Sequence, residues 1–599
     1  MQFQDCDFTG TLKLDGGIAN LVNCSMTVAP GSNHCVMASG AIIGAFTGCI
    51  FNPARTISNA ADPRRLIIDG RRASTSLLPI VDWPDIQQDL ASRRPARTSL
   101  FVVTNAPWNA TGNGIADDTA AIQSALNAAN TNGGGIVYLP AGKYKLTGTL
   151  DVPGGVELRG SYPSRHAAPL YDGHVKVSVL QPYGGAGTTN GPPAVALEAN
   201  AGIVGLTITY ELQNTNATPY PPAIQGRGAN IYARGVLCPN AYWFVDLNTY
   251  PCTNNFLYQV DGWALRNAFL IGNGSQGSIV ESMANLTYWD DNNLSQSQVG
   301  VGSTQEAPIQ SFSEHNSEWF VLGDCTELLV KDFDYMCHTF MHCVSQNGRG
   351  PWITGIETMI DDSVECFRFE AAAPCHIDIV NPEWMVTLEH YPDVTGYGVI
   401  STAAFQGTAR FFNAPLWGPR PWDYVIQGGD VGFELTHAGY RSTYGTKVDS
   451  GVLHLINGGF EGNTASLYTV PFNSASGGLA GKASEIIGCY AWSNVNDSQV
   501  NTNNPVFAWG NFAINVLSSQ AVFNVIPPVI SINPNSSGTA GNVAFNWRAD
   551  MGAFIPHYAT NLNAPIAWMT MTNVPCYASN RWSATDSPAD KQRFYRLQP

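Results

Sequence analysis

The sequence predicts an all-β protein built as a parallel β-helix, a solenoid in which short strands stack turn upon turn. Short strand-like segments bounded by Gly, Asn or Asp run through most of the chain, which contains 59 glycines in 599 residues. Segments of one pattern recur along it, which is typical of a solenoid. One short capping helix is expected near residues 117–130. We therefore expect a partial β-helix unit at 1–70, a linker at 71–100, the main β-helix at 101–530 and a small β module at 546–599.

The composition favours a protein that handles sugars and argues against several other partners. Charged residues make up 13% of the chain, which also contains 15 Trp and 23 Tyr, so the surface is neutral-polar and rich in aromatic rings. The net charge of −16 argues against nucleic acid or an anionic membrane as a partner, since either requires a basic face. No apolar run approaches the roughly 18–20 residues that cross a bilayer.

The beginning of the chain resembles the middle of a repeat. Residues 1–6 lack the basic head and the apolar core of a signal peptide. We therefore expect a secreted, extracellular protein whose signal peptide is absent from this sequence.

Three segments within residues 1–70 share a pattern in which Asp, Asn or Gly precedes a cysteine. The cysteines are Cys6, Cys24 and Cys49, spaced 18 and 25 residues apart, a plausible length for one turn of a β-solenoid. We interpret them as an internal stack of small buried thiols rather than as a metal or redox cluster. The 13 cysteines do not form CxxC pairs, so neither zinc nor another cofactor is expected.

Residues 101–162 contain the densest local signals. Asp117 and Asp118 stand at the head of a predicted helix, where carboxylates cap free N–H groups and meet the positive end of the helix dipole. An apolar face at helical spacing follows, formed by Ala121, Ile122, Ala125, Leu126 and Ala129. Asn132 and the glycines after it end the helix, and short strands follow. We assign both aspartates a structural role.

This stretch resembles the opening motif of the pectate-lyase-like superfamily of right-handed parallel β-helices. The matching residues are Gly114, Asp117, Asp118, Thr119, Ala121, Ile122, Gln123, Ala125, Gly134, Gly135, Val137, Tyr138, Leu139, Pro140, Ala141, Gly142, Tyr144, Leu158, Arg159 and Gly160. The resemblance implies that the helix plugs the open end of the β-helix. With the strand-like segments of residues 1–70, the chain is also similar to the tandem β-helix β-1,3-glucanases of glycoside hydrolase family 55. Such resemblances imply architecture and leave the substrate open.

Six segments between residues 328 and 492 align as rungs, that is, successive turns of the main β-helix. Their fifth residues, spaced 24 to 44 residues apart, are Asp332, Ile356, Asn381, Asn413, Asn457 and Gly488. Asn, Asp and Gly suit a tight bend between two strands, where a positive φ is needed. We interpret the longer gaps as loops inserted near 390–405 and 415–450. A column of stacked residues forms a ladder that suits an extended polymer.

Carboxylates on neighbouring rungs are the first catalytic candidates, because glycoside hydrolysis requires two carboxyl groups across the scissile bond. Asp361 and Asp362 follow a predicted strand, one rung after Asp334 and one rung before Glu383. Asp334 and Glu383 share the seventh column of the alignment. Inverting polygalacturonases similarly use aspartates on successive rungs, but the motifs of that family are absent here.

Four further residues are expected to contact the substrate: Trp384, Trp417, Arg368 and His342. The two tryptophans lie beside the column of acids, where their rings are expected to stack on sugars. Arg368 and Glu370 are expected to point outward, because the phenylalanines between and before them point inward. With His342 and Glu365 nearby, this group indicates substrate contacts, a lyase base, or a surface ion pair across rungs.

Residues 314–319 and Glu461 supply further candidate acids. Glu318 stands next to Trp319, which pairs an acid with a ring able to stack on a sugar. Because the family 55 glucanases use a glutamic acid as proton donor, the resemblance implies such a role for one glutamate here, and Glu318, Glu383 and Glu461 stay open.

These observations predict a secreted carbohydrate-active enzyme, a glycoside hydrolase that cleaves a glucan-like polysaccharide bound along the groove of the β-helix. A polysaccharide lyase on a uronate polymer is one alternative, although it needs a cation or a basic cluster and the chain has only 30 Lys and Arg. A non-enzymatic tailspike or adhesin β-helix that binds glycans is another, and it would form trimers. The enzyme is expected to be a monomer with a polysaccharide or oligosaccharide as its partner.

Overall fold

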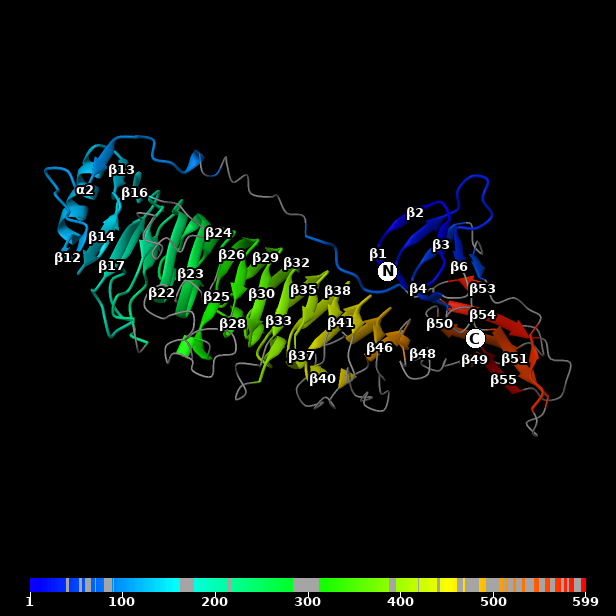
Figure 1. Ribbon diagram of the computed structural model, residues 1–599. Coiled ribbons are helices and arrows are strands. Elements are labelled where there is room, and N and C mark those ends of the chain that lie inside the picture. Colours follow the sequence, from blue (N-terminus) through cyan, green and yellow to red (C-terminus); the bar gives the residue numbers. More distant parts are fainter. Residues whose placement is uncertain are drawn as a thin grey trace.

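The computed structural model shows a long β-helix in the middle of the chain, with smaller β units before and after it (Figure 1). The structure describes residues 1–38, 42–52, 57–59, 66–69, 72–79, 89, 91–161, 177–213, 217–283, 312–313, 315–335, 337–386, 395–418, 420–438, 442–460, 467–468, 484–491, 506–509, 512–514, 521–523, 531–533, 543–548, 555–560, 566–571, 576–578, 581–586 and 594–598. The predicted all-β, parallel β-helix fold class is confirmed. Within the described ranges, no helix is long and apolar enough to cross a membrane.

Each rung of the main β-helix contributes one strand to each of three faces, here named A, B and C. Face A consists of β24 (Ser275–Val280), β26 (Cys325–Val330), β29 (Trp352–Ile356), β32 (His376–Val380), β35 (Thr408–Phe412), β38 (Asp430–Glu434), β41 (Val452–Ile456), β44 (Ser484–Ile487) and β46 (Val506–Trp509). Face B consists of β27 (Phe333–Tyr335), β30 (Met359–Ser363), β33 (Glu383–Val386), β36 (Pro415–Trp417), β39 (His437–Ala438), β42 (Gly459–Phe460), β45 (Tyr490–Ala491) and β47 (Phe512–Ile514). Face C consists of β25 (Glu318–Leu322), β28 (Thr339–Cys343), β31 (Glu365–Phe369), β34 (Tyr397–Ser401), β37 (Arg420–Ile426), β40 (Ser442–Val448) and β43 (Leu467–Tyr468). Strands of one face pair in parallel, so residues in register form columns across it.

Earlier rungs lead from the first end of the main β-helix to these faces. Their strands are β11 (Leu100–Val102), β12 (Asn113–Asp117), β13 (Gly135–Tyr138), β14 (Gly142–Leu146), β15 (Leu150–Val152), β16 (Val156–Arg159), β17 (Ser178–Pro182), β18 (Val195–Glu198), β19 (Gly202–Val204), β20 (Thr207–Ile208), β21 (Ile224–Arg227), β22 (Tyr232–Leu247) and β23 (Thr253–Ile271). α2 (Thr119–Thr131) lies at that end, and four of its side chains join the core: Ile122, Ala125, Leu126 and Ala129. The helix therefore plugs the β-helix, as the resemblance implied.

The two aspartates before α2 have different structural roles. Asp117 accepts a hydrogen bond from the backbone N–H of Thr119 at 3.1 Å, so it caps the first turn. Asp118 occupies the N-cap position, but its buried carboxylate accepts from the backbone N–H groups of Thr111 and Gly112 at 2.6 and 3.0 Å. The expectation that Asp118 also caps the helix is wrong, because its side chain fixes the preceding bend instead.

A corner with one left-handed residue per rung joins face A to face B. These residues, with φ between 50° and 63°, are Lys331, Glu357, Asn381, Asn413, Leu435, Asn457 and Gly488. The predicted bend is confirmed in four rungs and displaced by one residue in the first two, where Lys331 and Glu357 bend instead of Asp332 and Ile356. Backbone hydrogen bonds fix these corners, since Lys331 donates to the Ile356 carbonyl and Glu357 to the Val380 carbonyl, both at 2.9 Å. Tertiary pairing thereby offsets the cost of a positive φ in a side chain other than Asn or Gly.

The region expected to be a loop at 415–450 is a complete rung instead. β37, β38, β39 and β40 lie within it, and Leu435 is its corner residue. The alignment missed this rung because leucine occupies the bend where Asn or Gly was expected. β34 likewise lies inside the gap expected at 390–405.

Stacked aromatic rings fill the interior of these rungs. The ring centroids of Trp384 and Phe411 lie 4.9 Å apart, and those of Phe411 and Phe433 also lie 4.9 Å apart. Tyr424 stacks on Phe433 at 3.8 Å. Rings of this size bury large apolar areas and dominate core stability, so these rungs form a rigid support for the outer faces.

The first residues form a small β-helix of their own, with three parallel sheets. Its strands are β1 (Gln2–Gln4), β2 (Asp7–Thr9), β3 (Leu12–Leu14), β4 (Gly17–Val22), β5 (Ser25–Thr27), β6 (Val36–Ala38), β7 (Ile42–Thr47), β8 (Ile50–Asn52), β9 (Ile57–Asn59) and β10 (Leu66–Asp69). Positive φ angles at Asp5, Asn23 and Gly48 mark its corners. The cysteine that follows each corner is a free thiol packed in or against the core of this unit, which confirms the predicted stack.

This small unit and the residues after it contact face A of the main β-helix. Val22 packs with Ile456 and Ile487, and the Asn457 amide donates to the Phe3 carbonyl at 2.9 Å. Residues 72–79, here named the strap, continue along face A. Further on, Arg93 lies over the Phe256 ring at 5.2 Å, so the chain returns toward the plugged end.

Antiparallel strands follow the last parallel rungs. They are β48 (Ala521–Phe523), β49 (Ser531–Asn533), β50 (Val543–Arg548), β51 (Ile555–Ala559), β52 (Met569–Thr570), β53 (Cys576–Ala578), β54 (Arg581–Asp586) and β55 (Phe594–Gln598). β49 to β55 form two small sheets, and β49 lies upstream of residue 546, where the C-terminal module was expected to begin.

Candidate functional site

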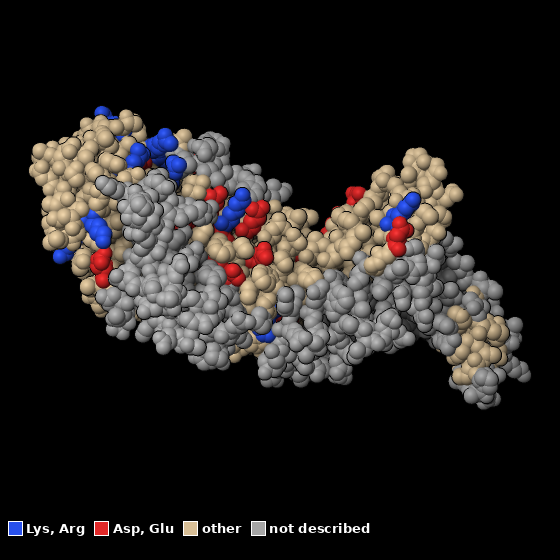
Figure 2. Space-filling view, viewed as in Figure 1, with Lys and Arg blue, Asp and Glu red and all other residues tan. Residues whose placement is uncertain are grey.

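A charged network lies on the outer surface of face C, across three neighbouring strands. Figure 2 shows charged side chains in separate groups, one of which carries both signs and lies over the middle of the main β-helix. Met341 of β28 and Phe367 of β31 are paired and fully buried, so the next residues, His342 and Arg368, point outward. Glu318, at the start of β25, lies one strand further on. The alternation of inward and outward residues therefore builds this site.

His342 holds the network together through both ring nitrogens. Its Nδ1 lies 2.8 Å from a Glu318 carboxylate oxygen, and its Nε2 lies 3.2 Å from one of Glu370. Arg368 donates from Nε to Glu370 at 2.7 Å and from Nη1 to Glu365 at 3.0 Å. Three carboxylates and two cations thus form one connected set, which is named the His342 network below.

The pKa values of the network follow from its contacts. Burial alone lowers the pKa of His342, but the neighbouring Glu318 and Glu370 carboxylates outweigh it and raise that pKa above its ordinary value. For the two acids the signs are reversed. Burial raises the pKa values of Glu318 and Glu370, but the cations beside them outweigh burial and bring both pKa values below their ordinary value. These contacts therefore favour a protonated His342 ring beside ionised Glu318 and Glu370.

Aromatic side chains continue one column of the network along face C. The residues in register are Glu318, Thr339, Glu365, Tyr397 and Trp422. Neighbouring strands lie about 4.8 Å apart, so this column runs for about 19 Å across face C, with Thr339 and Glu365 buried within it. Tyr397 and Trp422 are half-buried. Glu318 and the two rings are the members of this column that are open enough to contact an extended sugar polymer.

Two of the predicted site residues are wrong because they lie inside the β-helix. The Asp334 side chain is 0% exposed and accepts hydrogen bonds from Ser363 and from Cys337, the latter at 2.9 Å. Burial raises the pKa of Asp334 to about 7. Trp384 is also 0% exposed and stacks on core aromatics, so it cannot present its ring to a sugar.

The predicted column also differs from the register. Asp334 pairs with Ile360, which pairs with Trp384, whereas Glu383 pairs with Met359. Asp334 and Glu383 therefore do not share a column. The one-residue displacement of the corner at Lys331 explains this error, because it reverses the side of each residue that follows.

The other predicted residues divide between two faces. Asp361, Glu383 and Trp417 lie on face B, where Glu383 is exposed and the other two are half-buried. Asp362 lies on the same strand as Asp361, but its side chain, like Glu314 and Glu461, falls outside the described residues. His342 and Arg368 lie on face C. The structure therefore does not bring the eight residues into one site.

Two groups that were considered separately in the sequence come together on face C. Glu318, from the segment 314–319, is a direct partner of His342. They are 24 residues apart, about one rung, and this spacing was the available signal. Across the described part of the chain, no group of three or more His, Cys, Asp or Glu side chains is arranged to hold a metal ion.

Comparison with known proteins identifies the first rungs of the main β-helix. Residues 106–204 match the family model described as "Rhamnogalacturonase A/epimerase, pectate lyase-like". Mannuronan C5-epimerase AlgE1 of Azotobacter vinelandii is 35% identical over 103 residues, which is 16% of this chain and 7% of that protein. Mannuronan C5-epimerase AlgE5 of the same organism is 58% identical over 41 residues, 7% of this chain and 4% of that protein. The chain thus spans less than a tenth of the length of these relatives.

Solved structures show looser similarity over more of the chain. The bacteriophage Phi29 gene product 12 N-terminal fragment aligns with 13% identity and a TM-score of 0.47, covering 71% of this chain and 73% of that one. The Azotobacter vinelandii AlgE6 A-module aligns with 14% identity and a TM-score of 0.34, covering 69% of this chain and 99% of that one. The family-model match over residues 106–204 confirms that this chain resembles the pectate-lyase-like parallel β-helices, as its opening motif predicted.

Proposed function

We propose that the protein is an exported carbohydrate-active enzyme that binds an extended polysaccharide across face C and hydrolyses its glycosidic bonds. The observation that carries this proposal is the His342 network, in which a protonated ring and ionised carboxylates share one solvent-facing surface. In the column beside it, the half-buried Glu318, Tyr397 and Trp422 lie along about 19 Å and supply contacts for a chain of sugars. The net charge of −16 favours a neutral polymer over a polyanion.

His342 is the proposed proton donor to the leaving oxygen. Its raised pKa favours the protonated ring, and the lowered pKa values of Glu318 and Glu370 favour their ionised carboxylates. Glu318 orients the ring through Nδ1, and Glu370 is the half-exposed partner that a sugar can displace from Nε2. A donor with a pKa close to the working pH is the most effective general acid.

Glu365 is the proposed base that activates water. Arg368 and Thr339 hold its carboxylate, at 3.0 and 3.2 Å. Glu365 and His342 lie on adjacent strands, three register positions apart, which corresponds to roughly 10 Å along the strands. This separation lies far above the ~5 Å of a retaining pair and near the ~9.5 Å upper end for inversion. Inversion at the anomeric carbon is therefore the expected stereochemistry.

β-Elimination in a uronate polymer is the second candidate reaction. Its specific support is the placement of Arg368 close to Tyr397, since a lyase needs a cation for the uronate carboxylate and a base for its proton. Relatives of the first rungs include proteins named mannuronan C5-epimerase and alginate lyase. The pairing of both cations of the His342 network with carboxylates of the chain itself makes hydrolysis the preferred proposal.

A polysaccharide panel separates these reactions. Reducing ends without ultraviolet-absorbing products support hydrolysis, unsaturated products support elimination, and retention on a glycan without either product supports a binding protein. His342→Gln and Glu365→Gln should each abolish product formation, while His454→Gln, which alters a similar histidine on face A, should not. Full activity in both face C variants would contradict the proposed site.

A further inference from the structure

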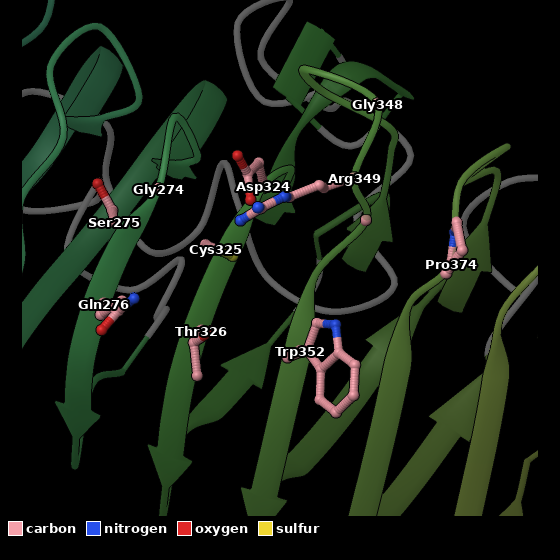
Figure 3. Close-up of a pocket in the computed structure, with 11 residues that line it drawn as sticks. Gly274, Ser275, Gln276, Asp324, Cys325, Thr326, Gly348, Arg349, Trp352 and Pro374 are labelled. Carbon is pink, nitrogen blue, oxygen red and sulfur yellow. The ribbon is translucent and has the colours of Figure 1, made fainter.

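A cleft at the corner between face C and face A has the properties of a second carbohydrate site. It has a volume of about 380 Å³, within the usual range of about 300–1,000 Å³ for ligand pockets. Its lining includes Asp324, Thr326, Arg349 and Trp352. Figure 3 shows these side chains around one opening, with Trp352 on β29 and Asp324 just before β26. None of them belongs to the His342 network.

Trp352 presents its ring to solvent in a fixed orientation. It is 57% exposed, although tryptophan is highly buried on average. His376, its partner in register on β32, lies 5.5 Å from it between ring centroids. The His376 ring is itself held by Asp378 at 2.8 Å and by Thr408 at 2.7 Å. The indole is thus held in an orientation suited to stacking before any ligand binds, and this preorganisation reduces the entropy lost on binding.

Arg349 lies on an equally rigid element. Gln346 and Arg349 exchange backbone hydrogen bonds at 2.8 and 2.9 Å around Asn347 and Gly348, whose φ angles are 53° and 75°. Two central residues with positive φ form the tight turn that Asn-Gly favours. The Gln346 side chain also accepts from the Asn273 backbone N–H at 2.6 Å, which anchors this hairpin to the preceding rung.

The polar groups of the cleft carry one charge of each sign. The Arg349 side chain points across the cleft toward Asp324 (Figure 3). A carboxylate accepts from sugar hydroxyls and a guanidinium donates to hydroxyl or ring oxygens, while the indole contacts the apolar face of the ring. A net charge of zero suits a neutral sugar better than a uronate. Thr326 and Gln276, in register with Trp352, extend the polar row onto the neighbouring strands.

From this geometry we propose that the cleft formed by Asp324, Arg349 and Trp352 is a binding subsite for a neutral hexose unit of a polysaccharide, separate from the face C site. The choice of a sugar as ligand rests on the proposed function. The residues 344–351 that carry Arg349 directly follow β28, the strand of His342, so a polymer held in the cleft is kept close to face C. The subsite then raises affinity for long chains without taking part in the reaction.

The test uses the full chain with Trp352→Ala, and Tyr250→Ala as matched control, because Tyr250 is an aromatic residue that is 43% exposed outside the cleft. Binding of a neutral β-glucan and of alginate is measured by isothermal titration in a His342→Gln background, so that the polymer is not consumed. We expect Trp352→Ala and Arg349→Ala each to weaken glucan binding about tenfold or more, and Tyr250→Ala to leave it within twofold.

Turnover distinguishes this subsite from the face C site. With His342 intact, Trp352→Ala should leave kcat on a short soluble oligosaccharide unchanged while raising KM on the long polymer. Equal loss of kcat on both substrates would place Trp352 in the reaction site and overturn the inference, as would unchanged glucan binding or binding of alginate alone. If no polymer is turned over by the unaltered chain, the proposed reaction fails, yet the loss of glucan binding in Trp352→Ala still supports the subsite.

Discussion

Faces A and C each carry a histidine between two carboxylates, with an arginine beside them. The sets are His342 with Glu318, Glu370 and Arg368 on face C, and His454 with Glu485, Asp430 and Arg410 on face A. Both rings are 15% exposed. In both, burial lowers the histidine pKa and the carboxylates outweigh it, so both pKa values are raised. Local chemistry alone does not distinguish the two sets.

The difference lies in what covers them. On face A, the strap bonds to the set directly: the Ser74 hydroxyl donates to Glu485 at 3.2 Å, and Arg410 donates to the Ser76 hydroxyl at 3.1 Å. Ser76 also donates its backbone N–H to Glu434 at 2.7 Å. Among the described residues, the partners of the His342 network come from face C and the rungs beside it. The set on face A holds the strap in place, so we assign it a structural role. The set on face C has no such contact with the strap among the described residues, so it is the candidate site.

The largest expected difference between the two sets is catalytic. His342→Gln should lower kcat at least a hundredfold, because it removes the proposed proton donor and general acids contribute about 10²–10⁴-fold. His454→Gln should keep kcat within twofold, since its set holds the strap. Steady-state rates on the active polysaccharide, with circular dichroism to confirm folding, measure both. Equal losses in the two variants would remove the distinction between the faces.

Stability should show the opposite order, with a larger loss for the arginine variant on face A than for the one on face C. Asp430 is buried and Arg410 donates to it at 2.8 Å, so Arg410→Met leaves a buried carboxylate with less compensation. We expect a loss of about 3 kcal/mol in unfolding free energy. Arg368 is about one-third exposed, so Arg368→Met should cost about 1 kcal/mol or less. Urea midpoints of the two variants give the order, and a greater loss in Arg368→Met would refute it.

The docking of the strap should weaken as pH rises. His454 has a raised pKa in the folded protein, so its stabilising charge is fully present below the ordinary histidine pKa of about 6.5 and is lost as pH rises through the higher folded value. Above it, Asp430, Glu485 and Glu434 face the strap with Arg410 as their remaining cation. Hydrogen exchange at the Ser76 amide should therefore accelerate beyond the intrinsic pH effect.

Two variants give the controls for this pH dependence. His454→Gln should make the protection of the Ser76 amide independent of pH over the same range, because the titrating ring is gone. His342→Gln, on face C, should leave the pH dependence as it is in the unaltered chain. Protection that stays constant with pH in the unaltered chain would show that His454 does not hold the strap.

The opening motif and the fold class could be predicted from sequence because they depend on local signals. The helical spacing from Ile122 to Ala129 and the glycines after it define the plug without any knowledge of the rest of the chain. Rung positions were harder to predict. Lys331 and Leu435 adopt left-handed corners that only their pairing with neighbouring rungs enforces, so no turn residue marks them.

The candidate site required the three-dimensional register. Once the corner was misplaced by one residue, Asp334 appeared to face outward although it lies in the core. Arg368 and Glu370 were found because the phenylalanines in 365–370 alternate cleanly with them. Glu318 could be recognised as a partner of His342 only once β25 was known to pair with β28. The long segment before β25 made this pairing hard to predict from sequence.

The smallest expected effect on activity is that of Asp334→Asn, because this carboxyl group lies inside the β-helix and contacts no solvent. kcat should stay within twofold of the unaltered chain. The pH dependence of the unfolding free energy should change instead. Burial raises the pKa of Asp334 to about 7, above the ordinary value of about 3.9, so its contribution is fully present at low pH and is lost as pH rises through about 7.

The Asp334→Asn variant should not lose this stability as pH rises, because an amide fits the same hydrogen-bonding position and does not ionise. Its urea midpoint should fall less than that of the unaltered chain between about pH 5 and about pH 9, the range around that pKa. Glu383→Gln, which changes an exposed carboxyl group on face B, is the matched control and should show the pH dependence of the unaltered chain. A large loss of kcat in Asp334→Asn would mean that an interior carboxylate supports the reaction, and the contrast between the strap-bound set on face A and the set on face C would no longer locate the site.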